Sequence, residues 1–231
     1  TVLRDIPYYD AQVKSGGWKG EKGYSEGLLD QKIGLVGYGM TVKHLIKMLK
    51  PFRPELLVYS SHISDDDLKT HNMKKASLEE IFSSCKIISL HSAMTEKNYH
   101  MITRELMEMI RPDAVMINTA RGGIIDEEAM TDLLEQDRFR VVLDVYEQEP
   151  LPEDHRLRKI KNSYFIPHMA GPTVDRRKYV TLGLIDDILN FFEGNPGKTF
   201  WIGLALSTGA AGLAAAWNGV LAPLLKPKEE A

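Results

Sequence analysis

The chain has 231 residues, a formal net charge of −3 and a sequence pI near 6.2. Hydrophobic residues make up 43% of it and charged residues 26%, which is ordinary for a globular protein and excludes a disordered or collagen-like chain. This charge creates no basic surface field, so nucleic acid is not an expected partner. The lone Cys85 excludes an internal disulfide, and the N-terminus lacks a signal-peptide pattern; both indicate a reducing, cytoplasmic setting.

Short apolar runs rich in β-branched residues alternate with longer segments of helical spacing, a pattern typical of βαβ units. The predicted strands are 32–36, 56–59, 87–90, 114–118, 141–144 and 164–166. Ser77 begins a capping box, and Asp126 can cap a helix over 127–136. Strands such as AVMIN and VVLD are continuously apolar up to their last residue, so helices must cover both faces of the sheet. The sequence therefore predicts an α/β fold with a doubly wound parallel sheet.

A glycine turn follows the first predicted strand in IGLVGYGMTV, before a helical stretch at 43–50. Gly37 permits the tight turn, Gly39 lets a pyrophosphate approach the backbone, and the next helix offers N–H groups to phosphates. Val42 replaces the third glycine of the G-x-G-x-x-G pattern, so we expect helix and strand to pack slightly farther apart. Taken alone, the motif leaves a dinucleotide site and a merely structural glycine turn both open.

The second predicted strand, LLVY, ends in Ser60 and Ser61 rather than in an acidic residue. A carboxylate at this position normally holds the ribose hydroxyls of NAD and repels the 2′-phosphate of NADP. Serine hydroxyls can hydrogen-bond either cofactor, so NADP is possible. Because no arginine lies in the turn to pair with a phosphate, NAD is the favoured cofactor. The alternative for both serines is a polar turn without a ligand.

Three later strands each end in a segment that carries a polar side chain. These segments are NTARGGIID with Arg121, DVYEQEP with Glu149 and PHMAG with His168. Carboxyl ends of parallel strands face the same crevice, so the three side chains can converge although they are distant in sequence. Each also has a structural alternative, as a surface ion pair or a loop residue.

The motifs NTARGGIIDEEA, LDVYEQEPLP and PHMAGPT, with the glycine turn before them, resemble the D-isomer-specific 2-hydroxyacid dehydrogenase family. The resemblance implies a Rossmann-type NAD-binding domain like that of phosphoglycerate dehydrogenase. It places the catalytic arginine at Arg121, the glutamate at Glu149, the histidine at His168 and the nicotinamide-amide aspartate at Asp144. The cofactor-binding residues expected on this basis are Gly37, Tyr38, Gly39, Met40, Thr41, Ser60, His91, Thr95, Thr119, Ala120, Arg121, Asp144, His168 and Gly171.

The residue types also suit the chemistry of a 2-hydroxy acid. Arg121 can bind the substrate carboxylate through both arms of its guanidinium group. His168 can exchange the hydroxyl proton near neutral pH, and a carboxylate at Glu149 would orient the imidazole and stabilise its protonated form. The stretch LHSAMT resembles the family's LHxPxT loop, with Ala93 in place of the proline, and puts His91 and Thr95 near the cofactor.

The resemblance also predicts how the chain is organised. Residues 1–26 correspond to a linker helix from a substrate domain, 27–170 to the NAD(P)-binding domain and 171–197 to a returning helix. About a hundred residues of substrate domain are expected to be absent, which would leave Arg121 and His168 in an open cleft. Residues 198–231 form an Ala/Gly-rich hydrophobic tail, in which 199–225 carries no charge. A membrane span there is possible, and a packed helix or a disordered extension is favoured.

Three functions stay open on these grounds. The first is hydride transfer between a nicotinamide cofactor and a D-2-hydroxy or 2-oxo acid; the others are a non-catalytic NAD(H) sensor and a membrane-tethered scaffold. The complete set of Arg121, Glu149 and His168 favours chemistry, because a sensor needs no acid/base pair. The family suggests a homodimer, the substrate acid is not identified, and the seven histidines show no spacing that predicts a metal site.

Overall fold

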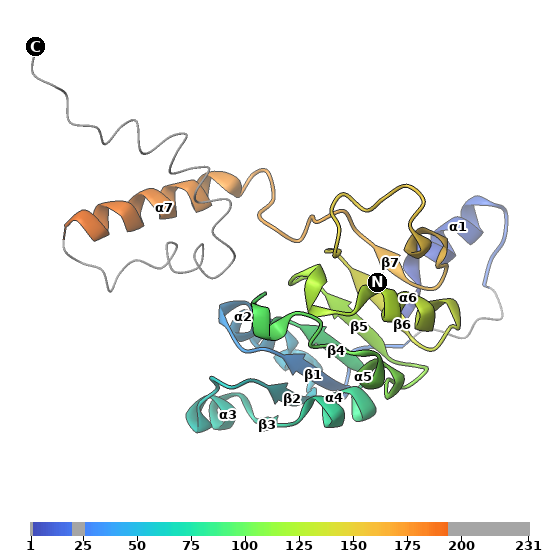
Figure 1. Ribbon diagram of the computed structural model, residues 1–231, viewed down its shortest axis with the longest axis horizontal. Helices are drawn as coiled ribbons and strands as arrows, with labels where there is room; N and C mark the ends of the chain where they lie inside the picture. Colours follow the sequence, from blue (N-terminus) through green and yellow to red (C-terminus); the bar gives the residue numbers. More distant parts are fainter. Residues whose placement is uncertain (1, 20–25, 194–231) are drawn as a thin grey trace, which may run out of the picture. The chain divides into compact units, whose positions relative to one another are not determined.

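The computed structural model describes residues 2–19 and 26–193 of the chain. The described residues divide into two units, one that ends at His168 and one that begins at Met169 (Figure 1). In the described part of the second unit, one long helix is present, α7 (Arg177–Phe192). The tail at 198–231 and the possible span at 199–225 lie outside the described residues. Within the described ranges, every helix is too short or too polar to cross a membrane.

The first unit is built on a seven-stranded sheet in the order β3-β2-β1-β4-β5-β6-β7, with all neighbours parallel. The six predicted strands are confirmed within one residue at each end. The sheet also contains β3, which has one buried residue and two exposed lysines and therefore no apolar run to reveal it. The strands are β1 (Lys32–Val36), β2 (Glu55–Tyr59), β3 (Met73–Lys75), β4 (Ile87–Leu90), β5 (Val115–Asn118), β6 (Arg140–Leu143) and β7 (Tyr164–Phe165).

Helices connect most of the strands, and side-chain caps begin three of them. Ser64, Ser77 and Asp126 each accept a hydrogen bond from the backbone N–H three residues further along. The helices are α1 (Ile6–Lys14), α2 (Met40–Leu49), α3 (Asp65–His71), α4 (Leu78–Ser84), α5 (Arg104–Glu108) and α6 (Glu127–Glu135), with 3₁₀ turns at Val2–Arg4, Lys50–Phe52, Glu96–Asn98, Gly122–Ile124 and Arg156–Lys159.

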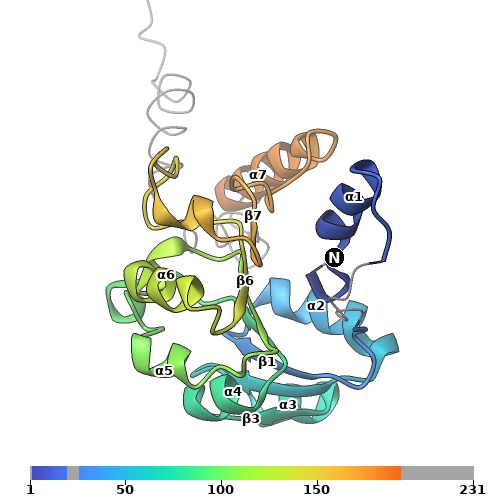
Figure 2. The ribbon, with the colours of Figure 1, turned by 90° about the vertical axis from the view of Figure 1, so that its right-hand side faces the viewer.

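Two hydrophobic cores lie on opposite faces of this sheet. Figure 2 shows α6 and α2 on the two sides of the strands. Helices α4, α5 and α6 bury residues such as Phe82 and Met107 in one core, and α2 buries Val42 and Ile46 in the other. The approach of α4 is close: a Cβ atom at Gly34 of β1 would lie 2.3 Å from the Ile81 methyl Cγ2. The predicted doubly wound α/β architecture is confirmed.

The strand register aligns the carboxyl ends of six strands in one row. Tyr59 pairs with Val36, Val36 with Leu90, Leu90 with Asn118, and Asn118 with Leu143, which pairs in turn with Phe165. Strand order reverses between β1 and β4, and ligands of open α/β sheets bind at the carboxyl edge beside such a reversal. Every site residue predicted in the first unit follows the end of a strand in this row.

Candidate active site

The glycine turn after β1 leaves room for a ligand on one side only. Gly37 has φ 105°, and a Cβ atom there would lie 2.8 Å from the carbonyl carbon of His91 and from the amide nitrogen of Ser92. Gly39, the N-cap of α2, has no atom within 4 Å of an added Cβ. Backbone therefore packs behind Gly37, and open space lies in front of the α2 N-terminus. An anionic pyrophosphate fits this arrangement.

The residues that follow the glycines form the first turn of α2. Met40 is 44% exposed and Thr41 is exposed, so both lie at the surface beside Gly39. Val42 is fully buried and packs in the core with Ile46. The valine in place of a third glycine is therefore part of the helix–sheet packing.

Tyr38 connects the glycine turn to α3. Its hydroxyl donates to Asp67 Oδ1 at 2.9 Å, and Lys43 Nζ lies 3.6 Å from the same oxygen. Burial and the hydrogen bond to Asp67 raise the pKa of Tyr38 to about 12. Hydrogen bonds from Ser64 and Tyr38 lower the pKa of Asp67, which keeps this carboxylate ionised. The structure thus brings an acidic side chain to the glycine turn that the strand pattern did not place there.

Ser60 lies directly after β2 and is partly buried. Its hydroxyl oxygen accepts the backbone N–H of His62 at 3.2 Å, which closes the turn. The hydroxyl hydrogen still allows Ser60 to donate to a ligand.

His91 and Thr95 lie in the segment after β4. The His91 N–H donates to Val36 at 2.7 Å, and its Nε2 is 2.9 Å from the Ser89 hydroxyl. Burial lowers the pKa of His91 to about 4, so the imidazole is neutral near pH 7. Thr95 is exposed at the start of a 3₁₀ turn, where its carbonyl accepts the N–H of Asn98 at 3.0 Å.

The loop after β5 is shaped by Asn118, whose side chain is fully buried. Its Oδ1 accepts the Ala120 N–H at 3.0 Å, and its Nδ2 donates to the Arg121 carbonyl at 2.9 Å. Thr119 is exposed between these contacts. The guanidinium of Arg121 donates to the Ala120 carbonyl at 2.6 Å. Asn118 therefore fixes the backbone at Ala120 and at Arg121, and so determines the position from which the Arg121 side chain extends.

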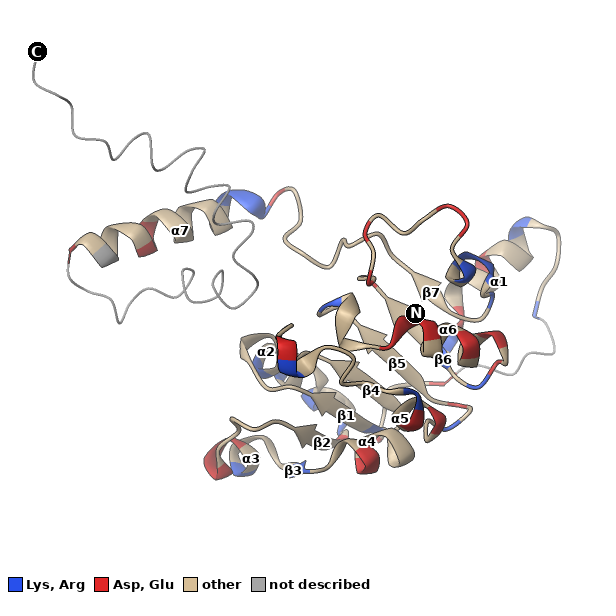
Figure 3. Cartoon of the chain, viewed as in Figure 1, with Lys and Arg blue, Asp and Glu red and all other residues tan. Residues whose placement is uncertain are grey.

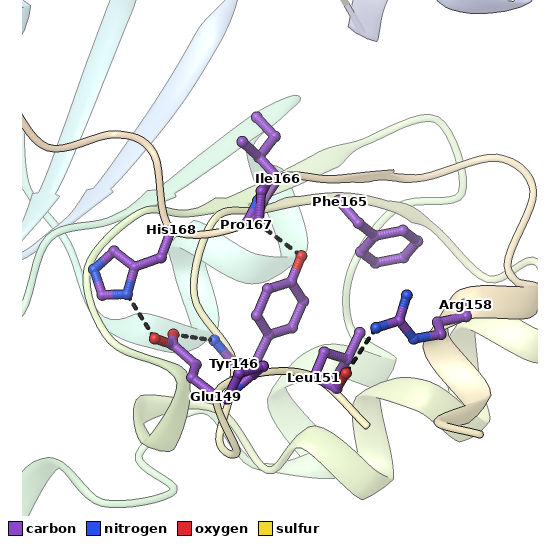
Figure 4. Close-up of a pocket in the computed structure, with 9 residues that line it drawn as sticks. Tyr146, Glu149, Leu151, Arg158, Phe165, Ile166, Pro167 and His168 are labelled. Carbon is purple, nitrogen blue, oxygen red and sulfur yellow. Dashed lines mark hydrogen bonds and ion pairs between the residues drawn. The ribbon is translucent and has the colours of Figure 1, made fainter. Parts of the chain in front are cut away.

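Glu149 and His168 form a pair in which Nδ1 lies 2.6 Å from Oε2 (Figure 4). The other carboxylate oxygen accepts the Tyr146 N–H at 2.9 Å. Partial burial opposes ionisation of Glu149, but the hydrogen bonds from His168 and Tyr146 and the charges of His168 and Arg121 outweigh it and lower its pKa. The predicted convergence thus appears in the structure as a direct pair, with Arg121 close enough to act on it electrostatically.

The backbone of His168 is held in the left-handed region, with φ 50°. Its N–H donates to the carbonyls of Asp144 at 2.9 Å and Ile166 at 3.1 Å. Asp144 follows β6 and is 1% exposed. Gly171 belongs to the second unit, where an added Cβ would meet no atom within 4 Å.

A cavity of about 750 Å³ adjoins the pair (Figure 4). The side chains around it are mainly apolar, with Glu149 and His168 at one side and Arg158 at another. Its lining residues are Tyr146, Glu149, Pro150, Leu151, Arg158, Phe165, Ile166, Pro167 and His168.

Sequence reasoning missed the residues that support this site. Asn118 and Glu127 are buried polar side chains that hydrogen-bond to the backbone of the site loops. Gly122 lies against the Tyr146 carbonyl, where an added Cβ would be 1.9 Å from the carbonyl carbon. The signal for Asn118 was present, because a buried strand that ends in asparagine requires a partner for its amide.

The chain is similar to several dehydrogenases and reductases. The D-3-phosphoglycerate dehydrogenase of Archaeoglobus fulgidus is 28% identical over 196 residues, which cover 84% of this chain and 37% of that protein. The glyoxylate reductase of Thermofilum pendens is 32% identical over 185 residues, 77% of this chain and 54% of that protein. The chain spans about a third to three fifths of the length of such relatives.

Solved structures share the fold. A formate dehydrogenase from Granulicella superposes with a TM-score of 0.76 at 24% identity and covers 84% of this chain and 53% of its own. An acyclic imino acid reductase, solved with NADPH and D-Arg, gives 0.75 at 24% identity over 84% of this chain and 62% of its own.

The family model of the D-isomer specific 2-hydroxyacid dehydrogenase NAD binding domain matches residues 1–170, well over half of the chain. Its match includes the glycine turn, Arg121, Asp144, Glu149 and His168. The chain therefore belongs to the D-isomer specific 2-hydroxyacid dehydrogenase family, and its residues 1–170 match the NAD binding domain of that family.

Proposed function

We propose that this chain carries the cofactor-binding and catalytic groups of an oxidoreductase that transfers hydride between NAD(H) and a small D-2-hydroxy or 2-oxo acid. The observation that carries the proposal is the pairing of His168 with Glu149 at 2.6 Å at the edge of a dinucleotide-type sheet. A pair of this kind supports proton transfer, which cofactor binding alone does not need.

In this proposal the two nitrogens of the His168 imidazole have different tasks. Nδ1 of His168 is engaged by Glu149, so Nε2 is the atom that exchanges a proton with substrate. When the hydroxy acid is oxidised, Nε2 takes the hydroxyl proton while the C2 hydrogen leaves as hydride. In the reverse direction, Nε2 returns the proton to the carbonyl oxygen. Bound nicotinamide supplies the hydride acceptor or donor.

Arg121 is proposed as the substrate anchor. Its guanidinium suits a carboxylate, and its backbone position is fixed by the Asn118 hydrogen bond to its carbonyl. The same positive charge helps to keep Glu149 ionised. Asp144 is proposed to accept the nicotinamide amide.

NAD is the favoured cofactor, with NADP as the alternative. Ser60 offers a hydroxyl donor to either ribose. Asp67, ionised beside Tyr38, adds negative charge near the glycine turn and opposes a 2′-phosphate, although Lys43 at 3.6 Å partly offsets it.

The predicted domain organisation, cytoplasmic setting and homodimer form part of the proposal. Helices α1 and α7 lie within the ranges assigned to the linker helix and the returning helix, 1–26 and 171–197. The free, buried Cys85 fits a reducing compartment. Light scattering coupled to size-exclusion chromatography measures the oligomeric state.

The test begins with fluorescence titration of the purified chain with NADH and NADPH. Glyoxylate, hydroxypyruvate and pyruvate are then added separately, and loss of nicotinamide absorbance is followed in wild type and His168→Ala. Saturable binding with consumption that disappears in the variant supports the proposal. Binding without consumption favours an NAD(H) sensor, and absence of binding refutes both.

A further inference from the structure

The turn that carries Glu149 is held at two consecutive backbone N–H groups by two different carboxylates. Glu149 accepts the Tyr146 N–H at 2.9 Å, and Glu127 Oε2 accepts the next one, the Glu147 N–H, at 3.0 Å. The first bond lies within the turn, whereas the second ties the turn to α6. Glu127 therefore links the backbone of this turn by a hydrogen bond to a helix anchored in the core.

Glu127 is an unusual residue to find in such a position. It is only 6% exposed, and burial raises its pKa even though the Glu147 hydrogen bond and the nearby His155 act in the opposite direction. A buried carboxylate is costly unless its oxygens are hydrogen-bonded. It lies in the first turn of α6, where acidic residues gather (Figure 3) and the helix dipole favours negative charge.

His155 explains why this position holds a carboxylate. Its Nδ1 accepts the Leu157 N–H at 3.3 Å, so in the neutral imidazole the proton lies on Nε2, which faces Glu127 Oε1 at 3.4 Å. Both neighbours of Glu127 are then donors. A carboxylate accepts on both oxygens, whereas the amide of glutamine would place its NH₂ group against one of the two donors.

We propose that Glu127 is a positioning residue for the dehydrogenase site. It holds the Glu147 N–H and thereby fixes the turn from which Glu149 reaches His168, while His155 orients the second oxygen of Glu127. The inference rests on the proposed function, because the Glu149–His168 pair needs a fixed geometry only if it takes part in catalysis. Glu127 itself contacts neither substrate nor cofactor in this scheme.

The test compares Glu127→Ala with Glu127→Gln and with Glu128→Ala, an exposed neighbour of the same charge in the same helical turn. Amide hydrogen exchange at Glu147 reads the proposed bond directly. In Glu127→Ala we expect its protection to fall by about tenfold or more, because the hydrogen-bond acceptor of this N–H is removed. Glu127→Gln should retain part of the protection, and Glu128→Ala should match wild type. Protection at Met130, whose N–H bonds within α6, reports that the helix is intact.

A second readout follows the catalytic pair. The downfield NMR signal of the His168 Nδ1 proton should weaken or shift in Glu127→Ala and stay unchanged in Glu128→Ala. In turnover, Glu127→Ala should lower kcat by about tenfold or more with little change in the KM for NADH, because the cofactor turn after β1 is untouched.

The outcomes separate this inference from the proposed function. Wild-type exchange at Glu147 in Glu127→Ala, or an unaltered His168 signal, overturns the inference even if the chain is an active dehydrogenase. Absence of turnover by wild type with any of the acids refutes the proposed function and, with it, the catalytic purpose of the bond, while exchange still reports whether the bond exists. If Glu127→Ala does not fold, the exchange protection of the Glu147 N–H in Glu127→Gln is the deciding measurement. A partial loss of this protection supports the inference, and wild-type protection overturns it.

Discussion

Among the glycines near the site, Gly122 is the one at which an added methyl group should most lower stability and activity. A Cβ atom there would lie 1.9 Å from the carbonyl carbon of Tyr146, 2.0 Å from its oxygen and 2.4 Å from the nitrogen of Glu147. All three atoms are backbone, so no rotamer change relieves the contact. Gly122→Ala must therefore push apart two loops, one that carries Arg121 and one that carries Glu149.

The size of the effect follows from the distances. Ordinary contact begins near 3.4 Å, so the two backbones must separate by roughly 1.5 Å. Overpacking of this kind costs about 3 kcal/mol, since the clash is with main chain. For a unit of this size, that corresponds to a fall in Tm of roughly 6–12 °C. A displacement above 1 Å between Arg121 and Glu149 should also lower kcat/KM by about a hundredfold.

Gly123→Ala is the matched control. Its Cβ would lie 3.0 Å from the terminal methyl of Met94 and 3.5 Å from the ring of Tyr99, and both side chains can move. We expect a loss below about 1 kcal/mol in urea denaturation and near wild-type turnover. If Gly122→Ala and Gly123→Ala unfold at the same denaturant concentration, the close packing of the two loops is refuted.

Three further changes test other parts of the site. Asn118→Asp keeps the acceptor for Ala120 but loses the donor to the Arg121 carbonyl and buries a charge, so denaturation should show a loss of about 2–3 kcal/mol. Burial lowers the pKa of His91 from 6.5 to about 4, so the stability that its neutral form contributes is present above pH 6.5 and is lost as the pH falls toward 4. The difference in unfolding free energy between wild type and His91→Gln should therefore shrink by up to about 3 kcal/mol between pH 6.5 and pH 4. A difference that stays constant over this pH range contradicts the prediction. Ser60→Asp should weaken NADPH binding by about tenfold or more and change NADH binding little, as judged by fluorescence titration.

The layers of the fold could be predicted because they depend on periodicity. Strands such as β4 and β5 are short, apolar on both faces and separated by helical segments, and the caps at Ser77 and Asp126 occur where the helices begin. β3 was missed because only Met73 of its three residues is buried. A strand with so little apolar surface is recognised from its pairing with β2, and the sequence alone does not show that pairing.

The placement of the candidate catalytic residues could be predicted for a different reason. Residues that follow parallel strands lie at one edge of a sheet whatever their separation along the chain, so topology alone brings Arg121, Glu149 and His168 to the same edge. The contact between Glu149 and His168 was expected from their chemistry and is present at 2.6 Å. Asp67 was not expected beside the glycine turn, because it reaches Tyr38 from a helix rather than from a strand end.

The supporting residues depend on a property that spacing does not encode, namely which backbone groups face a buried side chain. Asn118 faces one donor and one acceptor, the Ala120 N–H and the Arg121 carbonyl, and an amide provides the complement of both. Glu127 faces two donors, and a carboxylate provides two acceptors. An amide suits the first position and a carboxyl group the second because the groups that face them differ: one N–H and one carbonyl at Asn118, and one N–H and one imidazole nitrogen at Glu127. In each case the buried polar residue fixes the backbone beside a proposed catalytic group, so these residues should be as intolerant of substitution as the groups they hold.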